Sequence, residues 1–187
     1  MRRRGFTIIE LLAVIAILSV LMTIVVTAAA GVFRASRGKR ADAMKVALQA
    51  AIASYHAADP NGQWPSEIES KAQAGESGWL SDAAAQNVFR KIVQRSTGES
   101  GTVLPLVDPS ALFVAPSGAQ DGKTVGLSFN EARQGTEKRQ KLSVSNMCFG
   151  YPDESSGRWR RFSIYYSAAS DSVTVEKGRS STNMDSL

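Results

Sequence analysis

Hydrophobic residues are concentrated in one uninterrupted run near the start of the chain. Between Phe6 and Phe33 the only formally charged side chain is Glu10, and the 23 residues from Leu11 to Phe33 carry no charge. As an α-helix rising about 1.5 Å per residue, this run is about 35 Å long, which is enough to cross a bilayer. No proline occurs before Pro60. The sequence therefore predicts an unbroken helix through this run and beyond it.

The pattern becomes amphipathic after the apolar run. Met44, Leu48, Ala51 and Tyr55 recur at spacings of four, three and four, which places them on one face of a helix. We expect this face to lie against the rest of the chain. The sequence Asp-Pro-Asn-Gly at positions 59–62 then favours a turn and predicts the end of the helix.

The remaining sequence, residues 57–187, predicts a globular head with a small antiparallel sheet. A short helix is predicted over Ser81–Arg95, because Ser81 is a good N-cap and four apolar residues share one face. Those four are Val88, Phe89, Ile92 and Val93. Five apolar runs bounded by Pro, Gly, Asp and Ser are strand candidates: 112–115, 124–129, 142–149, 160–166 and 172–176. The last two form the best hairpin, with residues 168–171 as its turn, and the expected fold class is α+β.

Composition limits the kinds of chemistry that the chain can perform. The 187 residues include 22 Lys plus Arg and 17 Asp plus Glu, for a formal charge of +5, and the hydrophobic fraction is 43%. One Cys and one His allow neither a disulfide within the chain nor a Cys/His metal cluster. We expect no catalytic residues, no metal and no cofactor, and therefore no enzyme.

Charges flank the apolar run on both sides. The leader Arg2–Arg4 favours a cytoplasmic amino terminus, whereas the four cations after Phe33 oppose that rule. Those cations are Arg34, Arg37, Lys39 and Arg40. A secretory signal peptide cut before Gly31 is an alternative, since three alanines precede it. That alternative is less favoured, because the apolar core is slightly long for a signal peptide and Glu10 would serve no purpose in it.

Glu10 is the most informative residue in the sequence. A carboxylate at the centre of a bilayer costs roughly 2.5 to 3.5 kcal/mol on insertion scales, so an acid in such a run is a functional hypothesis that requires a cation. The alternative is that Glu10 lies near the interface and is simply hydrated. Its context favours the functional hypothesis, because Gly5-Phe6-Thr7-Ile8-Ile9-Glu10 follows a very short basic leader and opens directly onto the apolar run.

Met1 to Glu10 and the following apolar helix resemble the amino-terminal signal of type IV pilins and type II secretion pseudopilins. The shared pattern is a short basic leader, Gly, Phe, and Glu at the fifth position after the cut. The resemblance implies that a prepilin peptidase cleaves the Gly5–Phe6 bond and methylates the new amino terminus on Phe6. It also implies that Glu10 of one subunit pairs with the amino terminus of Phe6 in a neighbour. The apolar segment then stays in the mature protein.

The resemblance further implies an architecture and a set of partners. A leader, residues 1–5, would precede a transmembrane and filament-core helix at 6–33, an amphipathic continuation at 34–56 and an extracytoplasmic head at 57–187. Expected partners are other copies of the chain, related pseudopilins, the prepilin peptidase, an inner-membrane assembly platform and membrane lipid. The expected location is the bacterial inner membrane, with a single pass, and then the filament. Nucleic acid is not an expected partner.

The sequence departs from the family's usual pattern in two places. Many relatives have a proline within the apolar helix where this chain has Thr27. Major type IV pilins usually close a carboxy-terminal loop with a disulfide, whereas Cys148 is alone here. The lone cysteine favours a pseudopilin over a pilin.

Three features of the head suggest other activities. Residues 118–124 resemble a phosphate-binding loop, but three residues separate the glycines instead of four, so a hairpin turn is preferred. The acids Asp153 and Glu154, or Asp171 and Glu176, supply calcium-type oxygens without a recognised spacing. The run Arg158–Arg161 mixes charge with an aromatic residue, as DNA-binding surfaces do, although alternation along a strand divides it between two faces. A membrane-anchored binding module, such as a DNA-uptake pseudopilin, is therefore the alternative function.

Overall fold

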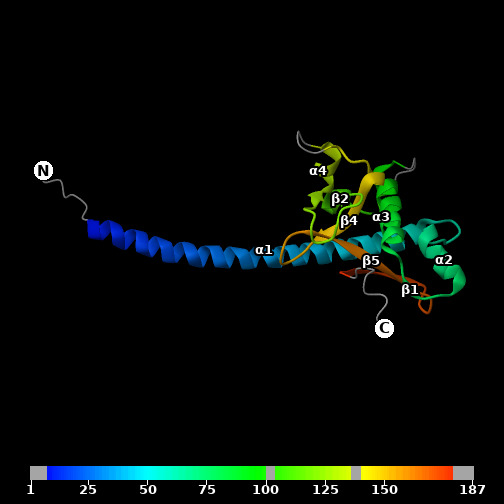
Figure 1. Ribbon diagram of the computed structural model, residues 1–187. Coiled ribbons are helices and arrows are strands. Elements are labelled where there is room, and N and C mark those ends of the chain that lie inside the picture. The colour runs from blue at the N-terminus through cyan, green and yellow to red at the C-terminus, as the bar shows by residue number, and fades with distance from the viewer. Residues whose placement is uncertain (1–7, 100–103, 136–139, 179–187) are drawn as a thin grey trace. The chain divides into compact units, whose positions relative to one another are not determined.

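A computed structural model describes residues 8–99, 104–135 and 140–178. The chain divides into two compact units, residues 1–36 and 37–187. Helix α1 (Ile8–Ala58) contributes residues to both units and is drawn from blue to cyan in Figure 1. It ends immediately before Asp59-Pro60, as the turn residues predicted.

The second unit is an α+β head, which confirms the predicted fold class. After α1 come α2 (Ser66–Ala74), β1 (Gly78–Trp79), α3 (Asp82–Thr97), β2 (Phe113–Pro116), β3 (Leu127–Ser128) and α4 (Phe129–Gln134). The chain continues through β4 (Met147–Pro152), β5 (Trp159–Ser167) and β6 (Ser172–Lys177). Two short 3-10 turns lie at Pro109–Ala111 and Val144–Asn146.

All the described strand pairs are antiparallel. The strands follow the order β1-β5-β4-β2-β3, and β6 pairs with β5. The β5–β6 hairpin has the longest register, from Phe162 opposite Lys177 to Ser167 opposite Ser172. Figure 1 shows α3 beside β4 and β5, next to the second part of α1. The predicted hairpin over the last two strands is thus confirmed.

One apolar core joins α1, α3 and the sheet. Met44, Leu48 and Ala51 of α1 are buried as predicted, and Tyr55 packs against the same cluster. The four predicted core residues of α3 are fully buried, and the Ser81 hydroxyl caps that helix by accepting a hydrogen bond from the amide of Ala84. The amphipathic patterns in both helices therefore identified the faces that pack.

Two strand predictions were wrong in part, and some elements were not predicted. Within the predicted strand 124–129, only Leu127–Ser128 is β-structure, because Ser128 caps α4 through a capping box with Glu131. Within the predicted strand 142–149, residues Val144–Asn146 form a 3-10 turn and β4 begins at Met147. Helices α2 and α4 and the two-residue strand β1 were not predicted.

Candidate functional site

Glu10 lies in the first turn of α1. Gly5 and Phe6, the predicted cleavage and methylation positions, lie outside the described residues. The structure therefore places the predicted acid in the first described turn of the helix.

The large apolar side chains in the first part of α1 are exposed. Every Ile, Leu, Val, Met and Phe from Ile8 to Phe33 is between 46% and 79% exposed. Eighteen consecutive residues of this helix have a mean hydropathy of 2.8, and none of the eighteen is buried. The helix is therefore long and apolar enough to span a membrane. Exposed apolar surface on this scale requires lipid or other apolar helices as its surroundings.

The hydroxyl groups in this run are satisfied inside the helix. The hydroxyls of Ser19, Thr23 and Thr27 donate to the carbonyl oxygens of the residues four positions earlier, at 2.7, 2.9 and 3.0 Å. Such bonds remove the need for water or for a polar partner in an apolar environment. The four-residue spacing of these three side chains is the signal for such bonds in the sequence.

The basic run Arg158–Arg161 forms no single exposed surface. Trp159 is fully buried, and the Arg161 guanidinium lies near its ring while bonding Asp82, Asp121 and the carbonyl of Ala119. Desolvation raises the pKa of Asp121, and the charge of Arg161 opposes that rise. No aromatic ring of this run is therefore available for stacking on nucleic-acid bases.

Trp64 links the turn after α1 to the β5–β6 hairpin. Its indole NH donates to Asp171 at 2.9 Å, and the hydroxyl of Tyr166 donates to the same carboxylate oxygen at 2.8 Å. These two bonds lower the pKa of Asp171. The His56 ring stacks on Trp64 with centroids 3.8 Å apart. The four side chains line an open pocket of about 330 Å³, in which the nearest ring to His56 is that of Trp64.

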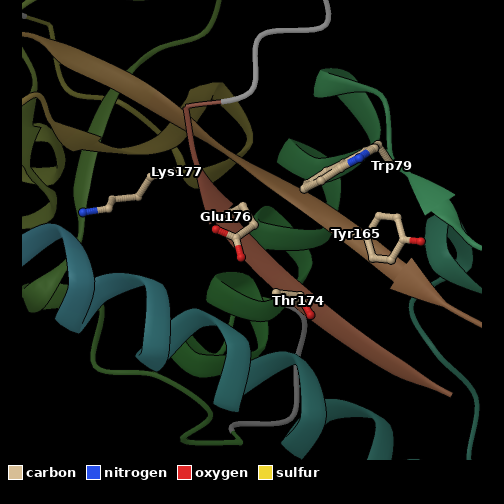
Figure 2. A pocket seen from close by; sticks show the side chains of 5 residues that line it. All are labelled: Trp79, Tyr165, Thr174, Glu176 and Lys177. Carbon is tan, nitrogen blue, oxygen red and sulfur yellow. The ribbon is translucent and has the colours of Figure 1, made fainter. Parts of the chain in front are cut away.

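A second open pocket of about 400 Å³ lies beside β5 and β6 (Figure 2). Trp79 and Tyr165 form a tilted aromatic pair with ring centroids 5.1 Å apart. Glu176 bonds Lys45 at 3.1 Å, and the ammonium of Lys177 points away from the aromatic rings. The charged groups of this pocket are thus used in holding the sheet to α1.

The acids considered as calcium ligands are held by protein groups. Asp153 accepts hydrogen bonds from Ser155 and Ser156 and pairs with Arg160 at 3.2 Å, and the hydroxyl bonds above all lower its pKa to about 2. Glu154 pairs with Lys177 at 3.3 Å. Among the described residues no group of three or more His, Cys, Asp and Glu is placed to hold a metal ion.

The phosphate-loop-like segment 118–124 is a turn. The amide of Gly122 donates to the carbonyl of Trp159 at 2.9 Å, and the segment leads into β3 and not directly into a helix. Its amides therefore do not form the cradle at a helix start that binds phosphate.

Cys148 is 5% exposed, and its sulfur lies 3.6 Å from a guanidinium nitrogen of Arg90.

Comparison with known proteins finds a match to the amino-terminal segment alone. Residues 1–26 match the model for the prokaryotic N-terminal methylation motif. The chain carries the signature of type IV pilins and pseudopilins. The match spans the leader, Glu10 and most of the apolar run, which is the segment whose residues carried the resemblance. No curated protein and no solved structure matches the chain.

A contact between the pilin-like helix and the head was missed by the sequence analysis. The side chain of Glu154, in the β4–β5 turn, packs against Gly38, where an added Cβ would lie 3.0 Å from its Oε1. Lys177 bonds both Glu154 and Asp42 of α1, the latter at 2.7 Å, and these bonds raise its pKa. Gly38 and Ala41, small residues one helical turn apart, were the available signal for a close approach to the helix.

Proposed function

We propose that this chain is a structural subunit of a filament, namely a pseudopilin or pilin-like protein. Prepilin peptidase cuts the Gly5–Phe6 bond, methylates Phe6, and leaves the apolar helix in the mature protein. Copies of the chain and related pseudopilins then assemble on an inner-membrane platform into a type II secretion pseudopilus or a type IV pilus-like filament. The observation that carries this proposal is the methylation motif over residues 1–26, which includes most of an exposed apolar run of α1.

The charge pair gives Glu10 its role in this proposal. Cleavage creates a cationic amino group on Phe6, four residues or about 6 Å of helix before Glu10. Opposite charges attract far more strongly in a low-dielectric environment than in water, so Glu10 of an incoming subunit is drawn to the amino terminus of a neighbour. Desolvation offsets much of this attraction, and the pair therefore sets the register of subunits more than it stabilises them.

The same proposal places the chain in the membrane and assigns it no catalysis. Before assembly it spans the inner membrane once, with the head on the extracytoplasmic side. The lone, buried Cys148 supports a pseudopilin over a disulfide-closed major pilin. The alternative, a membrane-anchored head that binds nucleic acid, has less support because Trp159 is buried and both Arg160 and Arg161 are paired with carboxylates.

Mass spectrometry of the mature protein from native cells tests the proposal. We expect an amino terminus at Phe6 that carries one added methyl group, and a membrane-bound or filamentous form. An amino terminus at Gly31 would instead establish a secreted domain released by signal peptidase. A retained Met1 on a protein that stays monomeric in lipid would refute the proposal.

A further inference from the structure

Four cations and one apolar side chain form a connected surface at the start of the head. The Arg37 guanidinium of α1 lies against Gly157, the residue before Arg158. The Arg158 guanidinium donates to the carbonyl of Lys123 at 3.0 Å, which lies two residues before Val125. The next residue, Gly126, lies against the ring of Phe113.

The surface closes on α1, because the guanidinium of Arg40 lies over that Phe113 ring, 4.4 Å from its centroid. We call this surface the basic collar. It consists of Arg37, Arg40, Lys123, Val125 and Arg158.

The four cations of the basic collar have no carboxylate within salt-bridge distance among the described residues. The acids nearby in the sequence are already used. Asp121 pairs with Arg161, and Asp153 with Arg160. Asp42 and Glu154 share the ammonium of Lys177. One carboxylate charge shared on Lys177 remains against four collar cations, so within the described chain the basic collar keeps a net positive charge.

Val125 adds an apolar element to this charged surface. It is 62% exposed, and outside the apolar run the only other large exposed hydrophobic residue in the described chain is Val46. An apolar side chain that lies between Lys and Arg residues suits the membrane interface, where cations meet headgroup phosphates and small apolar groups reach the acyl boundary. Binding of a nucleic acid gives no comparable reason to expose an isolated valine.

The position of the basic collar in the sequence points to the same partner. Arg37 follows Phe33, the last residue of the uncharged run, by four positions. Long cationic side chains just beyond a membrane span extend to the headgroup region, and guanidinium groups bind phosphate oxygens in a bidentate geometry. We propose that the basic collar binds the phosphates of anionic phospholipids in the leaflet from which the head emerges. This inference rests on the membrane anchoring in the proposed function.

Native mass spectrometry of the full chain in mild detergent tests the proposal. Phosphatidylglycerol and phosphatidylcholine compete for binding to three forms of the protein. These are the wild type, the double variant Arg37→Gln/Arg158→Gln and the double variant Arg40→Gln/Lys123→Gln. The matched control is Lys71→Gln with Lys141→Gln, which removes the same charge from the head outside the basic collar. The leader arginines are kept in every variant, and far-UV circular dichroism checks the fold of each.

We expect the preference for phosphatidylglycerol to fall about fivefold for each collar cation removed, and to change little in the control. Equal losses in the collar variants and the control would attribute binding to overall charge and overturn the proposal. An unchanged preference in both collar variants would overturn it as well. So would a salt-dependent affinity for single-stranded DNA that only the collar variants lose while lipid preference stays constant.

The proposed function fails in a different way. If the chain did not sediment with membranes at all, the anchoring itself would be wrong. A chain that is anchored, cleaved at Gly5–Phe6 and indifferent to lipid charge would refute the basic collar alone.

Discussion

The side-chain amide of Gln86 pairs with both backbone polar groups of Phe149. Its Nε2 donates to the carbonyl oxygen of Phe149 at 2.9 Å, and the Phe149 amide donates to its Oε1 at 2.6 Å. Strand β4 pairs with β5 only from Gly150 to Pro152, so an α3 side chain takes the place of a strand at the next position. Gln86 is 3% exposed, and the two bonds fasten α3 to the sheet.

Replacing Gln86 by leucine should destabilise the head. The substitution keeps a similar volume but leaves a buried amide and a buried carbonyl without partners, at about 1 to 3 kcal/mol for each group. We expect a loss of about 2 to 4 kcal/mol in the free energy of unfolding, measured by urea denaturation in detergent. Gln94→Leu on the same helix is the control, since Gln94 is half-buried and should tolerate the change. Equal stability of the two variants would contradict this account.

Gln86→Glu should make stability depend on pH. A protonated carboxyl group can donate to the Phe149 carbonyl and accept from its amide, whereas a carboxylate cannot donate. Burial raises the pKa of the new acid in the folded state, so its stabilising effect is complete below the unfolded pKa of about 4.3 and is lost as pH rises through the folded pKa. The midpoint of unfolding against pH measures this. A variant as stable at pH 8 as at pH 4, relative to the wild type, would refute the paired geometry.

The sequence predicted elements with long periodic patterns and missed those that depend on local or distant polar groups. Helix α2 has one buried residue, Ile68, and so gives no amphipathic signal. Helix α4 is only six residues long and begins at Phe129, the last residue of a predicted strand, although Ser128 and Glu131 have the spacing of a capping box. For elements this short, capping chemistry decides the structure more than the hydrophobic pattern does.

The side-chain contacts that hold the head together could not be predicted from the sequence, and the reason is physical. A glutamine is usually exposed, so nothing in the pattern of α3 marks Gln86 as a partner for β4. The contact of Glu154 with Gly38 joins residues more than a hundred positions apart. In contrast, the candidate site at Gly5, Phe6 and Glu10 depends on a short local motif, which a single sequence carries in full.

Two glycines should respond in opposite ways to replacement by alanine. A Cβ on Gly150 would lie 2.1 Å from the carbonyl oxygen of Arg160 and 2.4 Å from the indole nitrogen of Trp159, both on β5. Because backbone cannot move aside cheaply, we expect Gly150→Ala to cost about 3 kcal/mol. At Gly38 the nearest atoms belong to the flexible end of Glu154, and helix propensity favours alanine by about 1 kcal/mol.

Thermal unfolding of Gly150→Ala and Gly38→Ala measures this difference directly. The first should lower the midpoint clearly, and the second should leave it unchanged or raise it. A large loss in Gly38→Ala would mean that the contact between Glu154 and α1 is more rigid than the exposed side chain of Glu154 indicates.

Asp171 should make the head sensitive to acid. Hydrogen bonds from Trp64 and then Tyr166 lower its pKa in the folded state, so its stabilising effect is present above the unfolded pKa of about 3.9 and is lost as pH falls through the folded value. Asp171→Asn keeps an acceptor and tolerates the positive φ of 41° at this position, and should weaken this acid dependence at a small cost.

Asp171→Ala removes the acceptor and strains the turn, and should cost about 1 to 2 kcal/mol more than the asparagine variant. Fluorescence of the tryptophans during unfolding between pH 2 and pH 7 measures both variants. Identical acid profiles for the wild type and Asp171→Asn would place the acid sensitivity elsewhere, with Asp153 and its pKa of about 2 as the next residue to test.

Glu10→Ala should separate membrane insertion from assembly. Removing a carboxylate from an apolar helix eases insertion by roughly 2 to 3 kcal/mol, so cleavage at Gly5 and anchoring should persist. Loss of the partner for the amino terminus of Phe6 should stop assembly into shearable filaments, because the subunits lose the contact that sets their register. The matched control is Ser19→Ala, which removes a hydroxyl bonded within the same helix and should assemble normally. Immunoblots of the sheared fraction and amino-terminal sequencing of the membrane fraction measure the two steps, and unchanged polymer in Glu10→Ala would defeat the charge pair.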